Sequence, residues 1–407
     1  MQKIILFIVV LASFVSCDVD KLEPAQTKAF MKFFGDVGNT EGVDLLKLED
    51  GYLLLGNNFN GNLTTTVLIK TDLNGNQIWS TPFKSISGSS LAKSSNSYFI
   101  VGDGIDSDTT QQATKLSLIK TNLDGDIQEI TSLGEPNTHF HGTGVTVNSG
   151  EVVVCGYTNE PNSGPDSTFL YGYDATLTPS WDDVRKWKGG TSSKTLLYED
   201  IDSTFIWTSL YIIDNKNKIE GIKVSRDNPT ALVFDVLKDE DFLTGDLGDL
   251  GMDSGGGKII VQTAKNANNK NTIEVGTYYA ITGDPKQTFS IGSSDNNYSV
   301  GSVIQATDGS IIIIGSTDER VNKNEDDIEK NKNRSDVDFY LTKVDDNGSV
   351  SSVNGFTAII GGTGNEEGVA IVQANDRGFV FLGTMLNTNG VKMMVLVKVD
   401  VRGELIN

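Results

Sequence analysis

Short runs of apolar, mostly β-branched residues recur along the chain, and most end at Gly. Strong copies occupy residues 51–56, 97–102, 151–156, 310–315 and 378–383, and weaker copies occupy 203–208 and 257–262. The copies end at positions 56, 102, 156, 208, 262, 315 and 383. Each step is therefore about 50 residues, a spacing that predicts one repeat fold instead of a set of unrelated domains.

Each run belongs to a larger pattern of strands and turns. An apolar strand precedes it, and a third strand that often ends in Lys-Xaa-Asp follows it, as at 70–72, 343–345 and 398–400. The next turn carries Gly, and Asn-Gly pairs there supply the positive φ that a hairpin needs. A fourth strand follows, and four antiparallel strands per ~50 residues are typical of a β-propeller blade. In the fourth and fifth copies Lys223-Val224-Ser225 and Ala280-Ile281-Thr282 replace the Lys-Xaa-Asp end.

The two ends of the chain complement each other. The chain stops just after the third strand and turn of its last repeat, whereas residues 30–35 form a strand with no blade before them. Residues 30–35 resemble 356–361, and residues 38–43 resemble 364–369. We expect the N-terminal strand to complete the last blade, which removes two exposed strand edges. The sequence thus predicts an all-β, seven-bladed propeller of four-stranded antiparallel blades over residues 29–407, with six or eight blades as the alternatives.

The N-terminus reads as an export signal. Lys3 precedes an almost unbroken apolar run over residues 4–15, followed by Ser16 and Cys17. The run is shorter than the ~20 residues that a spanning helix needs, and it suits a secretory signal peptide. The segment before Cys17 resembles the lipobox of bacterial lipoproteins, in the looser form that has Phe14 where Leu is usual. That resemblance implies a signal peptide over residues 1–16, lipid on Cys17, and a polar tether over residues 17–28.

Residues 29–407 resemble the propeller-repeat lipoproteins of Bacteroidota, through the apolar runs, the Lys-Xaa-Asp ends and the Gly turns. The resemblance implies an outer-membrane lipoprotein, on either the periplasmic or the cell-surface face. It is specific for the fold and carries almost no information on function.

Composition narrows the choice of partners. The net charge of −21 disfavours nucleic acid and electrostatic docking on anionic lipid, so we expect membrane contact through the lipid anchor only. Of the two cysteines, Cys17 would carry the lipid, which leaves Cys155 as a buried, unpaired thiol. We expect a monomer and no cofactor.

One face of the propeller is predicted to carry the longer loops, at 57–65, 103–115, 158–167 and 316–338. We take it as the face for a protein or glycan partner. Asn39 and Glu41 share their Gly-Asn-Xaa-Glu-Gly setting with Asn365 and Glu367, and the two glutamates should enter adjacent inner strands at the channel mouth. They are candidate ligands for sugar hydroxyls or a cation. The alternative interpretation is that these side chains bond loop backbone and hold neighbouring blades together.

Motifs of catalysis and of metal binding are weak. His139 and His141 are the only histidines, and two ligands do not make a zinc site. No Gly-Xaa-Ser-Xaa-Gly elbow is present, and we assign no catalytic or metal residue. The leading hypothesis is a lipid-anchored binding or scaffolding module of the cell envelope. The alternatives are a glycan-active lyase or hydrolase with carboxylates at the channel mouth, and a purely structural envelope protein.

Overall fold

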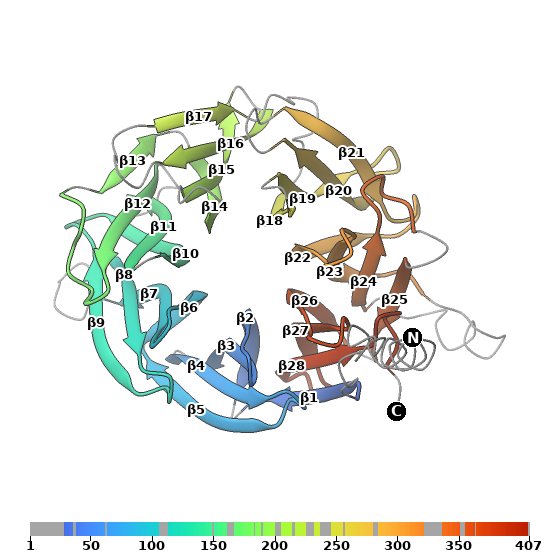
Figure 1. Cartoon of the computed structure of the whole chain (residues 1–407), viewed down its shortest axis with the longest axis horizontal. Coiled ribbons are helices and arrows are strands. Elements are labelled where there is room, and N and C mark those ends of the chain that lie inside the picture. The colour runs from blue at the N-terminus through green and yellow to red at the C-terminus, as the bar shows by residue number, and fades with distance from the viewer. Residues whose placement is uncertain are drawn as a thin grey trace, which may run out of the picture.

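Seven four-stranded antiparallel sheets stand around a central axis in the computed structural model (Figure 1). The structure describes residues 28–405 apart from 36–37, 62, 106–112, 149, 161–166, 183, 189, 200–204, 214–215, 225–231, 237–245, 255–256, 280–283, 321–335, 351–354 and 363. The predicted signal peptide, Cys17 and nearly all of the tether lie outside the described residues. Within them, no helix is long and apolar enough to cross a membrane. The seven-bladed all-β propeller is confirmed.

Each of the first six blades is built from four consecutive strands, and its first strand lies next to the central channel (Figure 1). The strands of blades 1 to 3 are β2 (Asn39–Lys47), β3 (Gly51–Asn60), β4 (Leu63–Asp72) and β5 (Gln77–Lys84); β6 (Ile86–Lys93), β7 (Tyr98–Ile105), β8 (Thr114–Thr121) and β9 (Ile127–Leu133); and β10 (His139–Asn148), β11 (Glu151–Asn159), β12 (Ser167–Asp174) and β13 (Arg185–Lys188). Those of blades 4 and 5 are β14 (Gly190–Glu199), β15 (Phe205–Ile213), β16 (Lys216–Val224) and β17 (Leu232–Val236), then β18 (Asp246–Met252), β19 (Lys258–Lys265), β20 (Asn271–Tyr278) and β21 (Pro285–Ile291). Blade 6 holds β22 (Tyr298–Gln305), β23 (Ile311–Thr317), β24 (Asp338–Val344) and β25 (Phe356–Ile360).

Blade 7 joins the two ends of the chain. Its strands are β26 (Glu366–Gln373), β27 (Phe379–Leu386), β28 (Lys392–Val399) and the N-terminal β1 (Phe30–Phe34). The pairing of β1 with β28 is antiparallel and sets Phe30 opposite Lys398 and Phe34 opposite Met394. The predicted closure of the ring by the N-terminal strand is therefore confirmed.

The hydrophobic core lies between neighbouring blades. The apolar runs of the repeat are the second strands, and side chains on both of their faces are buried, as for Leu53, Leu54 and Leu55. One cluster joins Phe34, Val380 and Met394 of blade 7 to residues of blade 1. Burial on both faces explains why these runs are continuously apolar, where a strand with one wet face would alternate.

In blades 1, 6 and 7 the Lys-Xaa-Asp signature holds the blade together at two points. The lysine of the third strand forms an ion pair with an aspartate in the turn between the first two strands. The pairs are Lys70–Asp50, Lys343–Asp308 and Lys398–Asp376. The aspartate of the signature closes the following turn: Asp72 Oδ1 accepts the backbone N–H groups of Asn74 and Asn76, each at 2.8 Å. In that turn Gly75 has φ 74°, as predicted for the Asn-Gly pair.

A β-bulge recurs at one position of the inner strands. Six of them, in all blades but the fourth, skip one residue against the second strand: Val43, Ser89, Thr143, Gly248, Gly301 and Val369. The strands approach closely at this level, and a Cβ added to Gly301 would stand 1.9 Å from the carbonyl oxygen of Gly368. The bulge re-aims the side chains that follow it toward the channel or the neighbouring blade.

Candidate functional site

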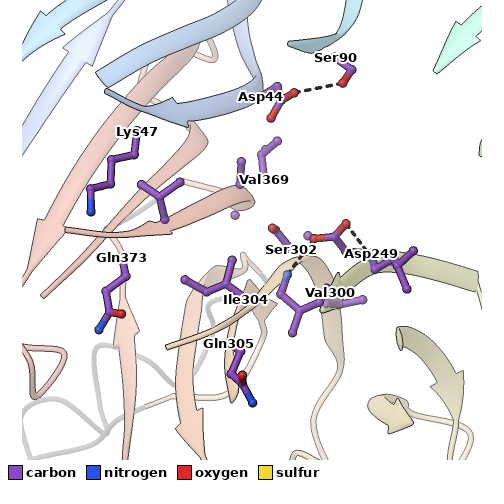
Figure 2. A pocket seen from close by; sticks show the side chains of 18 of the residues that line it. Asp44, Lys47, Ser90, Asp249, Val300, Ser302, Ile304, Gln305, Val369 and Gln373 are labelled. Atoms are coloured by element: carbon purple, nitrogen blue, oxygen red, sulfur yellow. Dashed lines mark hydrogen bonds between the residues drawn. The ribbon is translucent and has the colours of Figure 1, made fainter. Parts of the chain in front are cut away.

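The central channel forms a cavity of about 1120 Å³ lined by the inner strands (Figure 2). The residues just after the bulges line it, among them Asp44, Ser90, Asp249, Ser302 and Ala370. Two of these positions carry a carboxylate, and the others carry small side chains. The channel is therefore polar and acidic at the level of the bulges.

Both channel aspartates bind backbone of the next blade. Asp44 Oδ2 accepts the N–H of Leu91 at 2.7 Å, and Asp249 Oδ2 accepts the N–H of Val303 at 2.9 Å. Burial raises the pKa of Asp44 to about 6, partly offset by its backbone hydrogen bonds, while the charge of Asp249 raises it further. These carboxylates act as links between blades 1 and 2 and between blades 5 and 6.

Farther along the channel, two glutamines make the same kind of link. Gln373 Oε1 accepts the N–H of Thr307, and Gln305 Oε1 accepts the N–H of Ser254. Lys47 ends the first inner strand and also lines the channel; burial lowers the pKa of its ammonium group. The polar lining of the channel is thus largely committed to joining blades.

The sequence-predicted residues Asn39 and Asn365 also join blades. Asn39 Oδ1 accepts the N–H of Lys392 at the start of β28, at 2.9 Å, and Asn365 Oδ1 accepts the N–H of Val337, just before β24, at 3.2 Å. Each asparagine therefore connects its own inner strand to the third strand of the preceding blade.

The predicted glutamates stand on adjacent inner strands, β2 and β26. Glu41 Oε1 is 2.6 Å from Lys392 Nζ. That hydrogen bond is the main cause of the raised pKa of Lys392, and the charge of Glu367 adds to it. The exposed Glu367 lines a cavity of about 370 Å³, to which Lys392 also contributes. We call this the blade 6–7 cavity; it is lined by Asn271, Asn297, Tyr298, Ser299, Ser316, Val337, Asn365, Glu366, Glu367, Thr384, Leu386 and Lys392.

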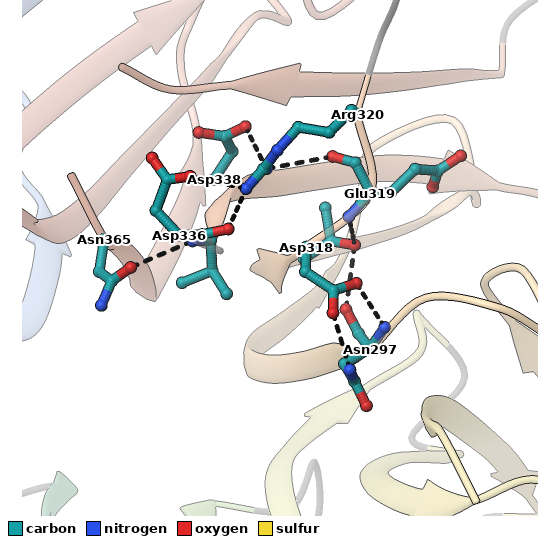
Figure 3. Close-up of polar contacts among 9 residues, drawn as sticks. Asn297, Asp318, Glu319, Arg320, Asp336, Asp338 and Asn365 are labelled. Atoms are coloured by element: carbon teal, nitrogen blue, oxygen red, sulfur yellow. Dashed lines mark hydrogen bonds and ion pairs between the residues drawn. The ribbon is translucent and has the colours of Figure 1, made fainter. Parts of the chain in front are cut away.

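A buried group of opposite charges borders this cavity (Figure 3). Arg320 Nη1 donates to Asp338 Oδ2 at 2.8 Å, and Arg320 Nη2 donates to Asp336 Oδ1 at 2.8 Å and to the carbonyl oxygen of the same residue. Asp338 also contacts the side chain of Glu366, which is 0% exposed. One arginine thus neutralises two aspartates, and the carboxyl of Glu366 has no cation of its own among these groups.

Burial and a neighbouring carboxyl group favour the protonated form of Glu366. No donor of ordinary hydrogen-bond geometry reaches either of its carboxyl oxygens. Burial raises the pKa of Glu366 to about 8, the hydrogen bond and charge of Asp338 raise it further, and the amide of Gly362 only partly offsets these effects. When two carboxyl groups are in contact, ionising both costs free energy because the like charges repel. The protonated Glu366 therefore donates to the carboxylate of Asp338.

Sequence reasoning missed Glu366, Asp338 and Arg320. The sequence prediction selected the repeated glutamates, Glu41 and Glu367. Glu366 belongs to the same matched segment, at the position equivalent to Thr40 of blade 1. In four other inner strands the equivalent residue also stands three positions before the one skipped at the bulge. These residues are Thr40, Ile86, Phe140 and Tyr298, and all are buried. A carboxyl group at a position that otherwise holds apolar or neutral side chains was the available signal.

The two histidines lie on β10, and their rings stack with centroids 6.1 Å apart. His141 Nδ1 is 2.6 Å from Asp103 Oδ2, while His139 Nδ1 accepts the N–H of Thr114 at 2.9 Å. Across the described part of the chain, no group of three or more His, Cys, Asp or Glu side chains is arranged to hold a metal ion.

No protein family model and no curated protein matches this chain. Solved structures do resemble it. The β-propeller domain of the Trilobed protease from Pyrococcus furiosus gives a TM-score of 0.51 at 9% identity, over 89% of this chain and 95% of that one. A protein of unknown function from Dyadobacter fermentans gives 0.50 at 10% identity, over 92% and 99%. An acylaminoacyl peptidase gives 0.50 at 9% identity, over 89% of this chain and 52% of that one. At these identities the likeness shows the β-propeller fold alone.

Proposed function

We propose that this chain is a binding or scaffolding module that presents its longer-loop face to a protein or glycan partner. The observation that carries the proposal is the blade 6–7 cavity, whose wall includes the buried Glu366 in contact with the carboxylate of Asp338. Burial of an acidic group reduces stability unless something compensates it. A volume of about 370 Å³ lies within the size range of small-ligand sites, and a partner can insert one side chain or one sugar unit there.

The partner can be sought with the soluble form that begins at Asp18. It should bind a specific glycan on an array, or retain one protein in stoichiometric amount from envelope extracts. Glu366→Thr, which copies Thr40 of blade 1, should weaken that binding at least tenfold. Asp50→Ala on the opposite face is the matched control and should leave it unchanged. Binding that survives Glu366→Thr but is lost in Asp50→Ala would contradict the proposed site.

The placement on the membrane is part of the same proposal. The Cys17 lipid and the polar tether would hold the propeller at the outer membrane, in keeping with the lipobox-like sequence. Cys17→Ala should move the protein from the membrane fraction to the soluble fraction, whereas Cys155→Ala should not. Continued membrane retention of the Cys17→Ala variant would refute the lipid anchor.

A glycan-active hydrolase or lyase is the alternative, and one observation favours it: Glu366 is a carboxylic acid protonated at neutral pH, as a general acid must be. The geometry fits poorly, because the carboxyl groups of glycosidases stand ~5–9.5 Å apart, whereas Glu366 contacts Asp338 directly. Release of reducing ends or unsaturated sugars from envelope glycans, abolished by Glu366→Gln, would establish the enzyme instead.

A further inference from the structure

The charges around the blade 6–7 cavity are unevenly matched. Its two nearby cations already have partners: Arg320 binds Asp336 and Asp338, and Lys392 binds Glu41 at 2.6 Å. Glu366 and Glu367 line the cavity beyond these pairs, and the carboxyl group of Glu366 is buried in its wall. On the next strand Tyr298 donates its hydroxyl to Glu319, which adds another negative charge close by. The site therefore attracts a cationic group and repels an anionic one.

The remaining walls suit a narrow apolar chain. Leu386, Val337 and the buried ring of Tyr298 line the cavity together with the carboxyl groups. Many of its other polar groups are occupied: Asn365 Oδ1 binds Val337, and Asn297 Nδ2 binds Asp318 (Figure 3). A hydroxyl-rich ring would leave its donors and acceptors unmatched against such walls, whereas an alkyl chain ending in an ammonium group satisfies both kinds of wall.

We propose that the blade 6–7 cavity binds the side-chain ammonium group of a lysine on a partner protein, with the carboxylates of Glu366 and Glu367 as acceptors. The inference rests on the proposed binding function and names the chemistry of the ligand. It uses the buried Glu366, whose carboxyl group contacts the carboxylate of Asp338 and no cation among the groups described around it.

Binding must release a proton. The ammonium group already carries all its protons, so Glu366 accepts it only as a carboxylate, and the proton it held with Asp338 passes to solvent. The groups facing Glu366 are Asp338, Asp336 and Arg320. Glu367 and the Lys392–Glu41 pair border the other side of the cavity. Because the pKa of Glu366 is about 8, nearly one proton should leave at pH 7 and almost none at pH 9.

The test is titration calorimetry of the soluble chain beginning at Asp18 with Nα-acetyl-lysine amide, in buffers of different ionisation enthalpy. We expect a dissociation constant near ~1 mM, since one side chain supplies few contacts. The Nε-acetylated compound is the matched neutral control and should bind at least tenfold more weakly. Proton release should fall between pH 7 and pH 9, and apparent affinity should rise with pH. Equal binding of the two compounds, or binding without proton release at pH 7, would overturn the proposal.

Variants separate this inference from the proposed function. Glu366→Gln should abolish proton release and weaken the binding of Nα-acetyl-lysine amide at least tenfold. Asp50→Asn on the opposite face should change neither the proton release nor the affinity. Glucosamine binding more tightly than lysine amide would overturn the assignment to a protein side chain. If lysine amide fails but partner capture still depends on Glu366, only the ammonium inference falls. If capture is also indifferent to Glu366→Thr, the proposed function falls with it. The comparison of the two lysine compounds on the unmodified chain holds even if a variant misfolds.

Discussion

The carboxylate of Asp44 accepts the backbone N–H of Leu91, 2.7 Å away, and so ties the inner strand of blade 1 to that of blade 2. Asp249 makes the same bond to blade 6 from the equivalent position of blade 5. The neighbouring post-bulge residues, Ser90 and Ser302, have no carboxylate to offer. At those junctions other groups make the inter-blade hydrogen bonds: Asp103 Oδ1 accepts the N–H of Gly142 between blades 2 and 3, and Gln373 Oε1 accepts that of Thr307 between blades 6 and 7.

Removing that bond should loosen the junction of blades 1 and 2. Asp44→Ala leaves the Leu91 N–H without its acceptor and should lower the free energy of unfolding by about 1–3 kcal/mol. Because burial raises the pKa of Asp44 to about 6, the folded chain binds this proton more tightly than the unfolded chain does. The stabilisation by Asp44 therefore declines as pH rises from 4 to 6, and the loss in Asp44→Ala should be larger at pH 4 than at pH 7.

Urea denaturation at the two pH values measures this difference. Ser302→Ala, at the equivalent position of blade 6, is the control and should change stability by less than about 0.5 kcal/mol. An Asp44→Ala variant no less stable than Ser302→Ala would show that the hydrogen bond contributes nothing.

Ring closure can be tested within one strand. Phe34 is 7% exposed and packs in the core between blades 7 and 1, whereas its neighbour Phe33 is 50% exposed. Phe34→Ala should cost about 3–5 kcal/mol of unfolding free energy, and Phe33→Ala less than about 1 kcal/mol. Thermal and urea denaturation of both variants distinguish them, and equal losses would mean that β1 contributes no packed side chain to the ring.

The ion pairs of the Lys-Xaa-Asp signature differ in burial, and burial determines how much unfolding free energy is lost when a pair is broken. Lys398 and Asp376 are 1% and 7% exposed, while Asp50, the partner of Lys70, is 62% exposed. Lys398→Met strands a buried carboxylate and should cost about 3–5 kcal/mol. Lys70→Met breaks the same pair in solvent and should cost less than about 1 kcal/mol. Adding Asp376→Leu to Lys398→Met should recover most of the loss in urea denaturation; failure to recover it would mean that packing, and not the stranded charge, causes the loss.

Regular repetition is what made the fold predictable from the sequence. The seven apolar runs are the second strands because each must bury both faces between neighbours, and that demand leaves a long apolar signature. The match between residues 30–35 and 356–361 found the closing strand for the same reason. Where the sequence departs from the repeat pattern, the ends of strands cannot be read from it. In blade 5, β20 ends at Tyr278, and the N–H of Tyr279 in the following turn donates to the carbonyl oxygen of Asp284. The third-strand end read from the sequence at 280–282 lies outside the described residues.

The site resisted prediction because its residues break the repeat. Asn39, Glu41, Asn365 and Glu367 were found because they recur, yet the asparagines link blades and Glu41 binds Lys392. A glutamate stands at this position in blade 7 alone among the repeats named above, and its neighbour Asp338 lies 28 positions earlier, at the start of β24 in blade 6. Only the packing of blade 6 against blade 7 brings their carboxyl groups together, and a single sequence holds no signal for that contact.

The thiol of Cys155 should be inert in the folded protein. It is fully buried in blade 3, and burial raises its pKa to about 12. Because the thiolate is the reactive form, a thiol reagent at pH 8 should label the soluble chain beginning at Asp18 at the rate of unfolding or slower. That chain contains no other cysteine, so mass spectrometry reads the site directly. Rapid labelling without denaturant would show that Cys155 is open to solvent.

Glu366 should make the stability of the protein fall in mildly alkaline solution. Its pKa is about 8 in the folded chain against 4.5 ordinarily, so between these values the folded chain holds a proton that the unfolded chain has lost. The proton therefore favours the folded chain, and its contribution disappears as pH rises from 5 to 9. Glu366→Gln has no such proton, and its amide can donate to Asp338 in place of the carboxylic acid.

The difference between the two proteins should consequently depend on pH. Glu366→Gln should be about as stable as the unmodified chain at pH 5 and more stable by about 1–3 kcal/mol at pH 9. Urea denaturation at pH 5, 7 and 9 gives both curves, and Asp44, present in both proteins, cancels from the difference. Parallel curves across this range would mean that Glu366 is ionised in the folded chain at neutral pH. A natural binding site that gains stability when its acid is removed is one shaped for a ligand and not for the fold.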